Sequence, residues 1–291
     1  MEIVQLLLGG IATGCVYGLV ALGFVLIYKA TEAVNFAQGD LMMLGAFITL
    51  QFVNSGYWGM PFWLGLALAT IVMAVIGYGM EALIIRKLFG QPQFAVVILT
   101  IAVGFVLRFL AGMIWGHELL SLETPFAGKN LAVLGVAVSY DEIFVIAATI
   151  LLTGALYLFF ARTRLGVAMQ ASSQNQLAAY YMGIPVKRLN SLIWALAGMV
   201  AAVAGILFAS KGSIEPSIGL LGIKAFAAAV IGGFGSLPGA LLGGLIVGLI
   251  EPFSARYIAA GYSQIMPYLL LFLILVFRPH GILAQVHSKK V

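Results

Sequence analysis

Two long apolar runs flank a polar, basic segment at residues 162–188, RTRLGVAMQASSQNQLAAYYMGIPVKR. The run before it is FVIAATILLTGALYLFFA, and the run after it is LNSLIWALAGMVAAVAGILFA. Each has about 20 residues, the length that an α-helix needs to cross a hydrocarbon core of roughly 30 Å. Each run therefore predicts a membrane-spanning helix. The segment between them is then a loop at one membrane face, and its middle has the composition of a short amphipathic helix that is available to a partner.

The same pattern fills the chain, which has 291 residues, of which 63% are hydrophobic and 9% are charged. This composition excludes a soluble fold. We predict an all-α polytopic membrane protein of one transmembrane domain (residues 1–291) with about eight membrane segments. The predicted spans are 3–28, 40–53, 61–85, 93–115, 141–161, 190–210 and 265–277, with a glycine-broken apolar region at 223–252. No cleavable signal peptide is expected, because the N-terminus lacks a basic region. Cys15 is the single cysteine, and we expect it to be a small buried hydrophobe.

The basic residues predict an orientation, because lysine and arginine concentrate in cytoplasmic loops. Ten of the fifteen fall on one side if the N-terminus is outside and the C-terminus is cytoplasmic: Lys29, Arg86, Lys87, Arg162, Arg164, Lys187, Arg188, Arg278, Lys289 and Lys290. Five acidic residues then lie outside: Glu118, Glu123, Asp141, Glu142 and Glu215. The segment 162–188 is therefore expected in the cytoplasm.

This orientation requires an even number of crossings between 162–188 and the tail. The segment 224–251 is interrupted by GGFGSLPG, which leaves two arms of about 14 residues, or roughly 21 Å each at helical rise. Such arms are too short to span upright. The segment either enters and leaves by one face or splits into two crossings. We predict a re-entrant helical hairpin that opens to the outside.

Polar residues inside apolar regions are candidates for a transport pathway. Asn35, Gln38 and Asp40 interrupt the pattern immediately before a short span, and broken helices commonly flank such pathways. For Asp40, N-capping of the following helix is an equally good interpretation. The hairpin adds further candidates for the pathway or gate, Gly232, Gly233, Gly235 and Pro238.

Other ionisable residues at membrane depth have structural interpretations. Arg108 is expected to extend its long side chain to the membrane surface. Glu81 lies about one turn before Arg86 and is expected to pair with it. Lys224 and Glu251 bound the broken hairpin, and we expect both near the outer face, where water hydrates them.

Small residues four apart predict close helix packing. The glycine pairs are Gly14-xxx-Gly18, Gly112-xxx-Gly116, Gly239-xxx-Gly243 and Gly244-xxx-Gly248. Packing within the chain is favoured over dimerisation.

No motif for catalysis, a metal or a nucleotide is evident. Gly233-Phe-Gly235 lacks the third glycine of a dinucleotide-binding loop, and no phosphate loop occurs. The histidines, His117, His280 and His287, have no metal-ligand spacing. The basic residues form no stripe for nucleic acid. We therefore expect no enzyme activity and no cofactor, and ATP, if it drives transport, would bind to other subunits.

Four segments carry a resemblance to a known family: NFAQGDLMMLGAF (35–47), RTRLGVAMQA with AAYYMGIP (162–185), IKAFAAAVIGGFGSLPGALLGGLIVGLIE (223–251) and LILVFRPHGIL (273–283). In these the chain resembles the permease subunits of branched-chain amino acid ABC importers, over essentially its whole length. Ala178, Ala179 and Gly183 match the AA-xxx-G part of the family's ATPase-coupling motif. Leu177 stands where a glutamate commonly precedes the alanines, so a salt bridge from that position is not expected.

The resemblance implies a multi-pass protein of the bacterial inner membrane that imports branched-chain or related amino acids. Its implied partners are a second related permease or a second copy, two cytosolic ABC ATPases and an extracytoplasmic solute-binding protein, in a lipid bilayer. Alternatives are an ABC permease for urea or amides and a standalone secondary transporter or channel. The last would need intramembrane carboxylates or a filter for coupling ions, and no deep acid pair is evident.

Overall fold

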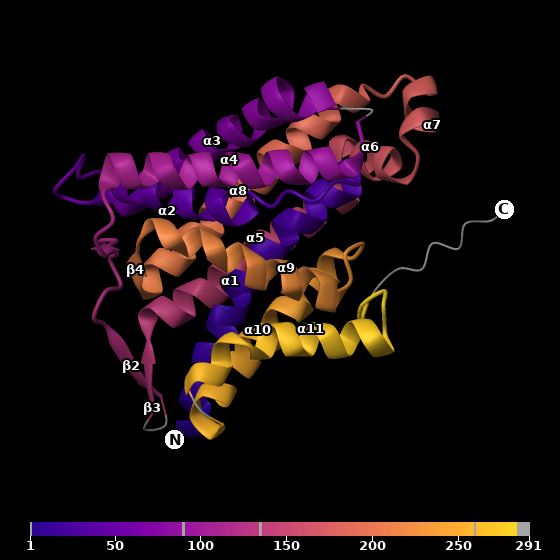
Figure 1. Ribbon diagram of the computed structural model, residues 1–291. Helices are drawn as coiled ribbons and strands as arrows, with labels where there is room; N and C mark the ends of the chain where they lie inside the picture. Colours follow the sequence, from indigo (N-terminus) through magenta and orange to yellow (C-terminus); the bar gives the residue numbers. More distant parts are fainter. Residues whose placement is uncertain (1, 89–90, 134–135, 259, 284–291) are drawn as a thin grey trace.

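The computed structural model describes residues 2–88, 91–133, 136–258 and 260–283 as a bundle of helices (Figure 1). The long helices are α1 (Glu2–Thr31), α3 (Phe62–Gly79), α4 (Gln93–Trp115), α5 (Tyr140–Arg162), α8 (Val186–Lys211) and α10 (Leu237–Tyr257). A π-helical turn, η1 (Met80–Ile84), and a 3-10 turn, η2 (Ile85–Leu88), extend α3. Within the described ranges, six helices are long and apolar enough to cross a membrane. The all-α polytopic prediction is thereby confirmed.

Shorter elements complete the bundle. The helices are α2 (Gln38–Val53), α6 (Arg164–Gln174), α7 (Gln176–Tyr181), α9 (Leu221–Gly232) and α11 (Met266–Phe277), with 3-10 turns η3 (Pro216–Leu220) and η4 (Ala260–Gln264). The strands are β1 (Leu120–Ser121), β2 (Asn130–Val133), β3 (Val136–Ser139) and β4 (Ser213–Ile214). β1 pairs antiparallel with β4, and β2 with β3. Each predicted span from 3–28 to 265–277 corresponds to one helix.

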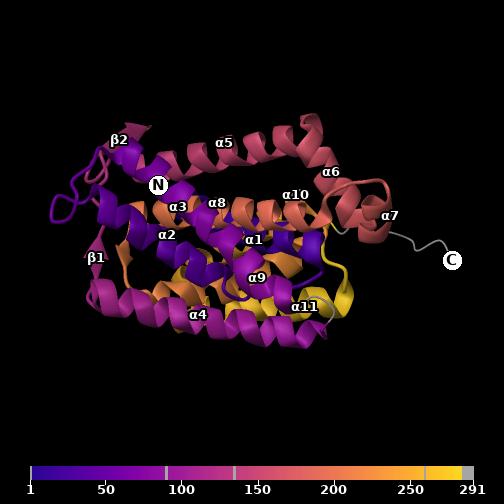
Figure 2. The ribbon, with the colours of Figure 1, turned by 90° about the horizontal axis from the view of Figure 1, so that it is seen from above.

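The two ends of the bundle differ in structure. Helices α6 and α7 lie at one end and the strands at the other, and these are called the α7 end and the β end (Figures 1 and 2). Arg86 of η2 donates a hydrogen bond to the Lys187 carbonyl at the start of α8, so both lie at the α7 end. At the β end, Glu123 accepts hydrogen bonds from Ser55. Basic residues also lie at the β end, since Lys129 directly precedes β2 and Lys211 contacts Gly9 and Thr13 near the start of α1. The orientation stays a prediction, and Lys289 and Lys290 lie outside the described residues.

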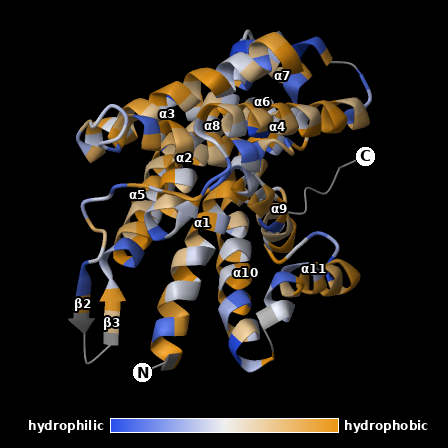
Figure 3. Ribbon diagram, turned by 60° about the vertical axis from the view of Figure 1, so that its left-hand side comes forward, coloured by the Kyte–Doolittle hydropathy of each residue, from blue (hydrophilic) through white to orange (hydrophobic). Residues whose placement is uncertain are grey.

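The sides of the bundle are hydrophobic. Figure 3 shows hydrophobic residues along α3, α4 and α11 and hydrophilic residues in the connections beside α7. On α4, Phe105, Phe109 and Met113 are each more than 60% exposed. A surface of this kind is stable in lipid, where apolar side chains need no cover from water.

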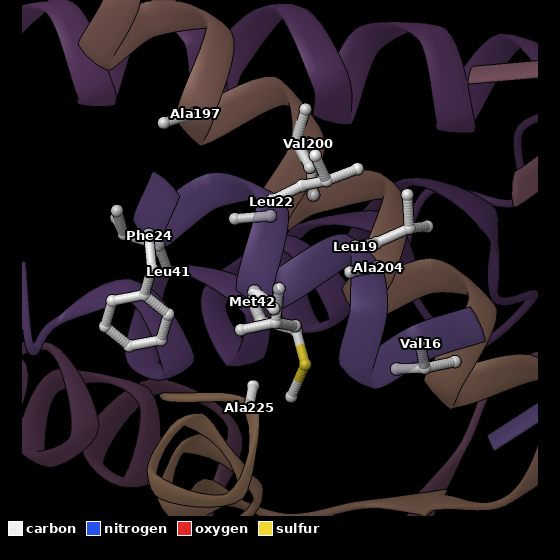
Figure 4. Packing of buried hydrophobic residues seen from close by; sticks show 14 of the residues in the cluster. Val16, Leu19, Leu22, Phe24, Leu41, Met42, Ala197, Val200, Ala204 and Ala225 are labelled. Atoms are coloured by element: carbon white, nitrogen blue, oxygen red, sulfur yellow. The ribbon is translucent and has the colours of Figure 1, made fainter. Parts of the chain in front are cut away.

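Helix α1 forms the centre of the bundle and packs against α8, α9 and α10. Figure 4 shows part of this core, with Val16, Leu19, Leu22 and Phe24 of α1, Leu41 and Met42 of α2, and Val200 and Ala204 of α8. All of these side chains are almost fully buried. Because α1 is apolar on every side, it is suited to a position surrounded by other helices.

Glycines bring α1 and α10 into backbone contact. A Cβ atom at Gly244 would overlap the backbone of Gly18, and one at Gly248 would overlap that of Gly14. The motifs Gly14-xxx-Gly18 and Gly244-xxx-Gly248 therefore face each other within one chain. This confirms the packing interpretation for these two motifs.

The other two glycine motifs differ from each other. Gly239-xxx-Gly243 packs α10 against α9, since Cβ atoms there would overlap Gly232 and Ala228. Gly112 instead lies beside the His117 imidazole. Gly116 ends α4 with a φ of 84°. The motif Gly112-xxx-Gly116 therefore lies at a helix terminus, where Gly112 packs against His117.

The predicted hairpin exists, but its second arm was predicted wrongly. Helix α9 is short and ends at Gly232, whereas α10 runs for 21 residues to Tyr257 and is long enough to cross a membrane. Glu251 does not end α10, because its charge is paired inside the bundle. The turn lies at the α7 end, where Leu283 donates its backbone N–H to the Gly232 carbonyl at 3.0 Å. A hairpin of one short and one spanning arm replaces the re-entrant one.

Candidate functional site

Two capped helices form the segment 162–188. Thr163 caps α6, since its Oγ1 accepts the Gly166 N–H at 2.9 Å. Asn175 caps α7 in the same way, its Oδ1 accepting the Ala178 N–H at 2.9 Å. Short polar side chains at these positions satisfy backbone donors that the first turn leaves free. The sequence thus specifies two short helices here.

Gly183 ends α7. Its φ is 81°, a conformation that favours glycine because it has no Cβ. The Gly183 N–H binds the Tyr180 carbonyl, and the Ile184 N–H binds the Ala179 carbonyl, both at 3.0 Å. This is the Schellman pattern of a helix C-terminus. Gly183 thus ends α7 immediately before Ile184-Pro185.

The predicted coupling residues lie on two faces of α7. Leu177 is 68% exposed, and Ala178 and Gly183 are also at the surface. Ala179 is only 5% exposed and faces the rest of the chain. Three exposed apolar neighbours, Tyr180, Tyr181 and Met182, were not among the predicted site residues. Their apolar character inside a polar segment was the signal in the sequence.

A groove separates α7 from the beginning of α8. It has a volume of about 850 Å³ and is lined by Gln176, Leu177, Tyr180, Pro185, Val186, Lys187, Arg188 and Asn190. No carboxylate is among these lining residues. The groove therefore combines apolar walls with a basic rim.

Asp40 is buried in the first turn of α2. Its Oδ1 accepts hydrogen bonds from Arg108 Nη2 at 2.8 Å and Nε at 3.1 Å. The carboxylate lies between Gly104 of α4 and Gly219 of η3, where a Cβ atom would overlap it. Asp40 makes no capping hydrogen bond in α2, so the capping interpretation was wrong. The prediction that Arg108 extends to the membrane surface was also wrong, because its guanidinium is held by Asp40.

Asn35 and Gln38 anchor the start of α2. Asn35 Oδ1 accepts the Ala37 N–H at 3.1 Å, and Gln38 Nε2 donates to the Ala197 carbonyl of α8 at 3.2 Å. Thr100 of α4 accepts the Phe36 N–H at 3.1 Å. Both polar side chains are fully buried. Hydrogen bonds thus satisfy the polar groups at the break between α1 and α2.

The candidate pathway residues form two separate groups. Asn35, Gln38 and Asp40 are buried inside the bundle, where Asp40 lies beside η3. Gly232, Gly233, Gly235 and Pro238 lie in and beside the hairpin turn at the α7 end. An aromatic chain connects the groups. Phe226 of α9 has its ring centroid 5.1 Å from that of Phe36 and 5.5 Å from that of Phe234.

Glu81 forms a polar cluster at the α7 end. Its Oε2 lies 2.8 Å from Arg86 Nη2, as predicted, and Ser191 of α8 hydrogen-bonds both residues. Glu81 is fully buried. It lies in η1, where the helix departs from α geometry. The cluster joins the close of α3 to the beginning of α8, next to the groove.

Replacing Glu81 with glutamine is expected to lower the free energy of unfolding by about 1–2 kcal/mol. Glutamine keeps the shape and one acceptor but loses the charge that Arg86 pairs with. Thermal unfolding in nanodiscs measures the effect, with the exposed Glu32→Gln as the matched control. A Glu81→Gln variant as stable as this control would contradict the role of the charge.

Lys224 and Glu251 are paired rather than hydrated. The Lys224 ammonium contacts the Glu251 carboxylate, and both side chains are less than 15% exposed. Tyr17 of α1 donates its hydroxyl to Glu251 Oε2 at 2.8 Å. The expectation of two solvated residues was wrong, because α9 and α10 bring them together against α1.

Among the described residues, no group of three or more histidine, cysteine or acidic residues is placed to hold a metal ion. His117 and His280 are in separate connections, and His287 lies outside the described residues. Cys15 is a buried free thiol.

Comparisons with known proteins agree on one family. Residues 6–275 match the family described as branched-chain amino acid transport system permease component. The permease protein BraD of a high-affinity branched-chain amino acid transport system in Pseudomonas aeruginosa is 33% identical, over 99% of this chain and 97% of its own length. The corresponding LivH of Escherichia coli is 29% identical over the same shares. A probable LivH of Methanocaldococcus jannaschii is 31% identical over 91% of this chain and 87% of its own.

Proposed function

The chain belongs to the branched-chain amino acid transport permease family, and on that premise we propose that it is the transmembrane permease subunit of an ATP-driven importer. Its cargo would be branched-chain or related amino acids moving into the cytoplasm. Urea and amides are the alternative cargo. The chain itself would bind no ATP. Its role would be to form the transport pathway and to change conformation during transport.

One observation supports the proposal that α7 couples the protein to an ATPase: the exposed surface of this helix is apolar. Leu177, Tyr181 and Met182 are each more than 65% exposed on a helix that lies beyond the apolar sides of the bundle. The groove beside them has a basic rim at Lys187 and Arg188. Such a surface suits a protein partner with apolar and acidic residues. The partner would be one of two cytosolic ABC ATPases, and Ala178 and Gly183 would let it approach closely.

This assignment orients the protein. The α7 end and the C-terminus would face the cytoplasm of a bacterial cell, and the β end and the N-terminus would face outward across the inner membrane. A solute-binding protein would deliver cargo at the β end. A second related permease, or a second copy, would complete the pore.

The pathway would be controlled where irregular backbone meets inside the bundle. Gly39 packs against Gly219 and Gly222, so the breaks that precede α2 and α9 are in direct contact. Two short helices that start inside a bundle and touch at their starts can shift without breaking a spanning helix. Asn35, Gln38 and Asp40 would hold the closed arrangement, and the turn from Gly232 to Pro238 would follow α9.

Replacing Leu177 with aspartate tests coupling. Leu177 packs little within the chain, so the fold should remain while the surface for the ATPase is lost. We expect at least a tenfold loss of ATPase co-purification and of amino acid uptake, as for a residue central to an interface. Leu119→Asp is the matched control, since Leu119 is 69% exposed near the β end.

The measurement uses the complete complex in proteoliposomes with its binding protein and radiolabelled leucine or urea. Normal ATPase retention and uptake with Leu177→Asp would overturn the coupling assignment. Uptake by this chain alone without ATP would instead establish a secondary transporter.

A further inference from the structure

A cavity of about 310 Å³ opens at the α7 end between α1, α5, α6 and the start of α10. Its polar wall consists of Lys29, Gln170 and Ser236. Its apolar wall includes Leu22, Leu156 and Leu241. Leu22 lies two helical turns from Lys29 on α1, about 10 Å along the axis. The cavity is therefore cationic and polar at one end and apolar at the other.

Lys29 has no partner in the described part of the chain. It makes no ion pair or hydrogen bond there, and no carboxylate lines the cavity. A smaller adjoining cavity shares Lys29, Phe160, Gln170 and Leu237. The cationic end of this paired space thus has an ammonium group without a counter-ion, which favours an anionic ligand.

The start of α10 also favours an anionic ligand in the cavity. Gly235, Ser236, Leu237 and Pro238 line the cavity, so the N-terminal end of a 21-residue helix faces it. Helix N-termini carry partial positive charge. Deeper in the cavity, the Thr153 hydroxyl is buried and has no hydrogen-bond partner among the described residues. A ligand that reaches this depth would carry an acceptor beyond its charged group.

The cavity opens along α5, where Tyr157 is 70% exposed on an apolar helix face. A molecule that enters from this side comes from the bilayer. A glycerophospholipid has a phosphate at the interface, ester carbonyls about one turn deeper and acyl chains below them. Its phosphate matches Lys29, and its ester and acyl region matches the deeper wall, which Thr153 shares with Leu22 and Leu156.

We propose that this cavity is a binding site for an anionic phospholipid of the leaflet at the α7 end, with the phosphate at Lys29 and the start of α10. The lipid would fill the space between α5 and the hairpin turn. Because the turn also adjoins α9, the bound lipid would support the position of a short helix that starts inside the bundle.

Native mass spectrometry of the purified protein with dioleoylphosphatidylglycerol tests the site. Lys29→Gln is expected to weaken retention of this lipid about fivefold, the effect of one lysine at a membrane surface. Lys87→Gln is the matched control, because Lys87 is an exposed lysine at the same end that does not line the cavity. Lys29→Arg should retain the lipid. Thr153→Phe, which fills the deeper part, should weaken binding while Lys29 stays in place.

Three results would overturn the proposal. Equal retention of dioleoylphosphatidylcholine would show that anionic charge is not recognised. Displacement of the lipid by millimolar inorganic phosphate would identify an ion site without acyl recognition. Unchanged retention in both Lys29→Gln and Thr153→Phe would place the lipid elsewhere, for instance if a second permease covers this face.

Discussion

Replacing Asp40 with alanine is expected to lower the free energy of unfolding by about 3–5 kcal/mol, the effect of removing one partner of a buried ion pair. The guanidinium of Arg108 would remain in the bundle without its carboxylate, and its side chain is only 22% exposed. The variant would also leave an empty space between Gly104 and Gly219. We expect most of the protein to be lost from the folded fraction, as measured by size-exclusion chromatography and thermal unfolding in nanodiscs.

A second substitution separates charge from packing. Arg108→Met in the Asp40→Ala background removes the unpaired cation and keeps an apolar side chain of similar length. Buried ion pairs replaced by apolar groups are often neutral in stability. The double variant should therefore recover most of the loss. If it were no more stable than Asp40→Ala alone, the pair would not be the source of the effect.

Replacing Gly244 with leucine is expected to separate α1 from α10 and to destabilise the bundle by about 3 kcal/mol, as overpacking of a rigid contact does. A Cβ atom at Gly244 would overlap Gly18 and would lie within 2.8 Å of the Gly14 carbonyl oxygen. The obstructing atoms are backbone, so no rotamer change makes room. Thermal unfolding and the yield of monodisperse protein measure the loss.

Gly154→Leu is the matched control for this substitution. Gly154 also lies within a long helix, α5, but a Cβ atom there would have nothing within 4 Å. The same change in helix propensity and hydrophobicity should leave stability nearly unchanged. Similar losses in both variants would indicate a general intolerance of leucine rather than the α1–α10 contact.

Most helix positions were predictable from the sequence. Apolar runs end at charged residues, such as Arg86 and Arg162, or near prolines such as Pro61 and Pro92. In lipid the chain must satisfy its backbone groups internally, so a run of spanning length has only the helix available. The ends of α7 were predictable for a related reason. Polar caps and Gly183 act through hydrogen bonds to residues nearby in the sequence.

Partners of buried charges were predictable only when they were close in sequence. Glu81 and Arg86 lie five residues apart, and their pair was predicted. Asp40 and Arg108 lie 68 residues apart, and local pattern contains no sign of their contact. The prediction of the second arm of the hairpin was wrong for the same reason. Glu251 resembles a helix end in the sequence, and only the structure shows that Lys224 neutralises its charge and Tyr17 donates a hydrogen bond to it.

The sequence by itself determined that this chain is a bundle of membrane helices, because hydrophobicity acts on each segment independently of its neighbours. The tertiary structure alone decided which helix is central, how the breaks before α2 and α9 meet at Gly39 and Gly219, and that Lys29 adjoins a cavity. Those outcomes depend on contacts between residues that are distant along the chain, and such contacts form only after the helices have packed.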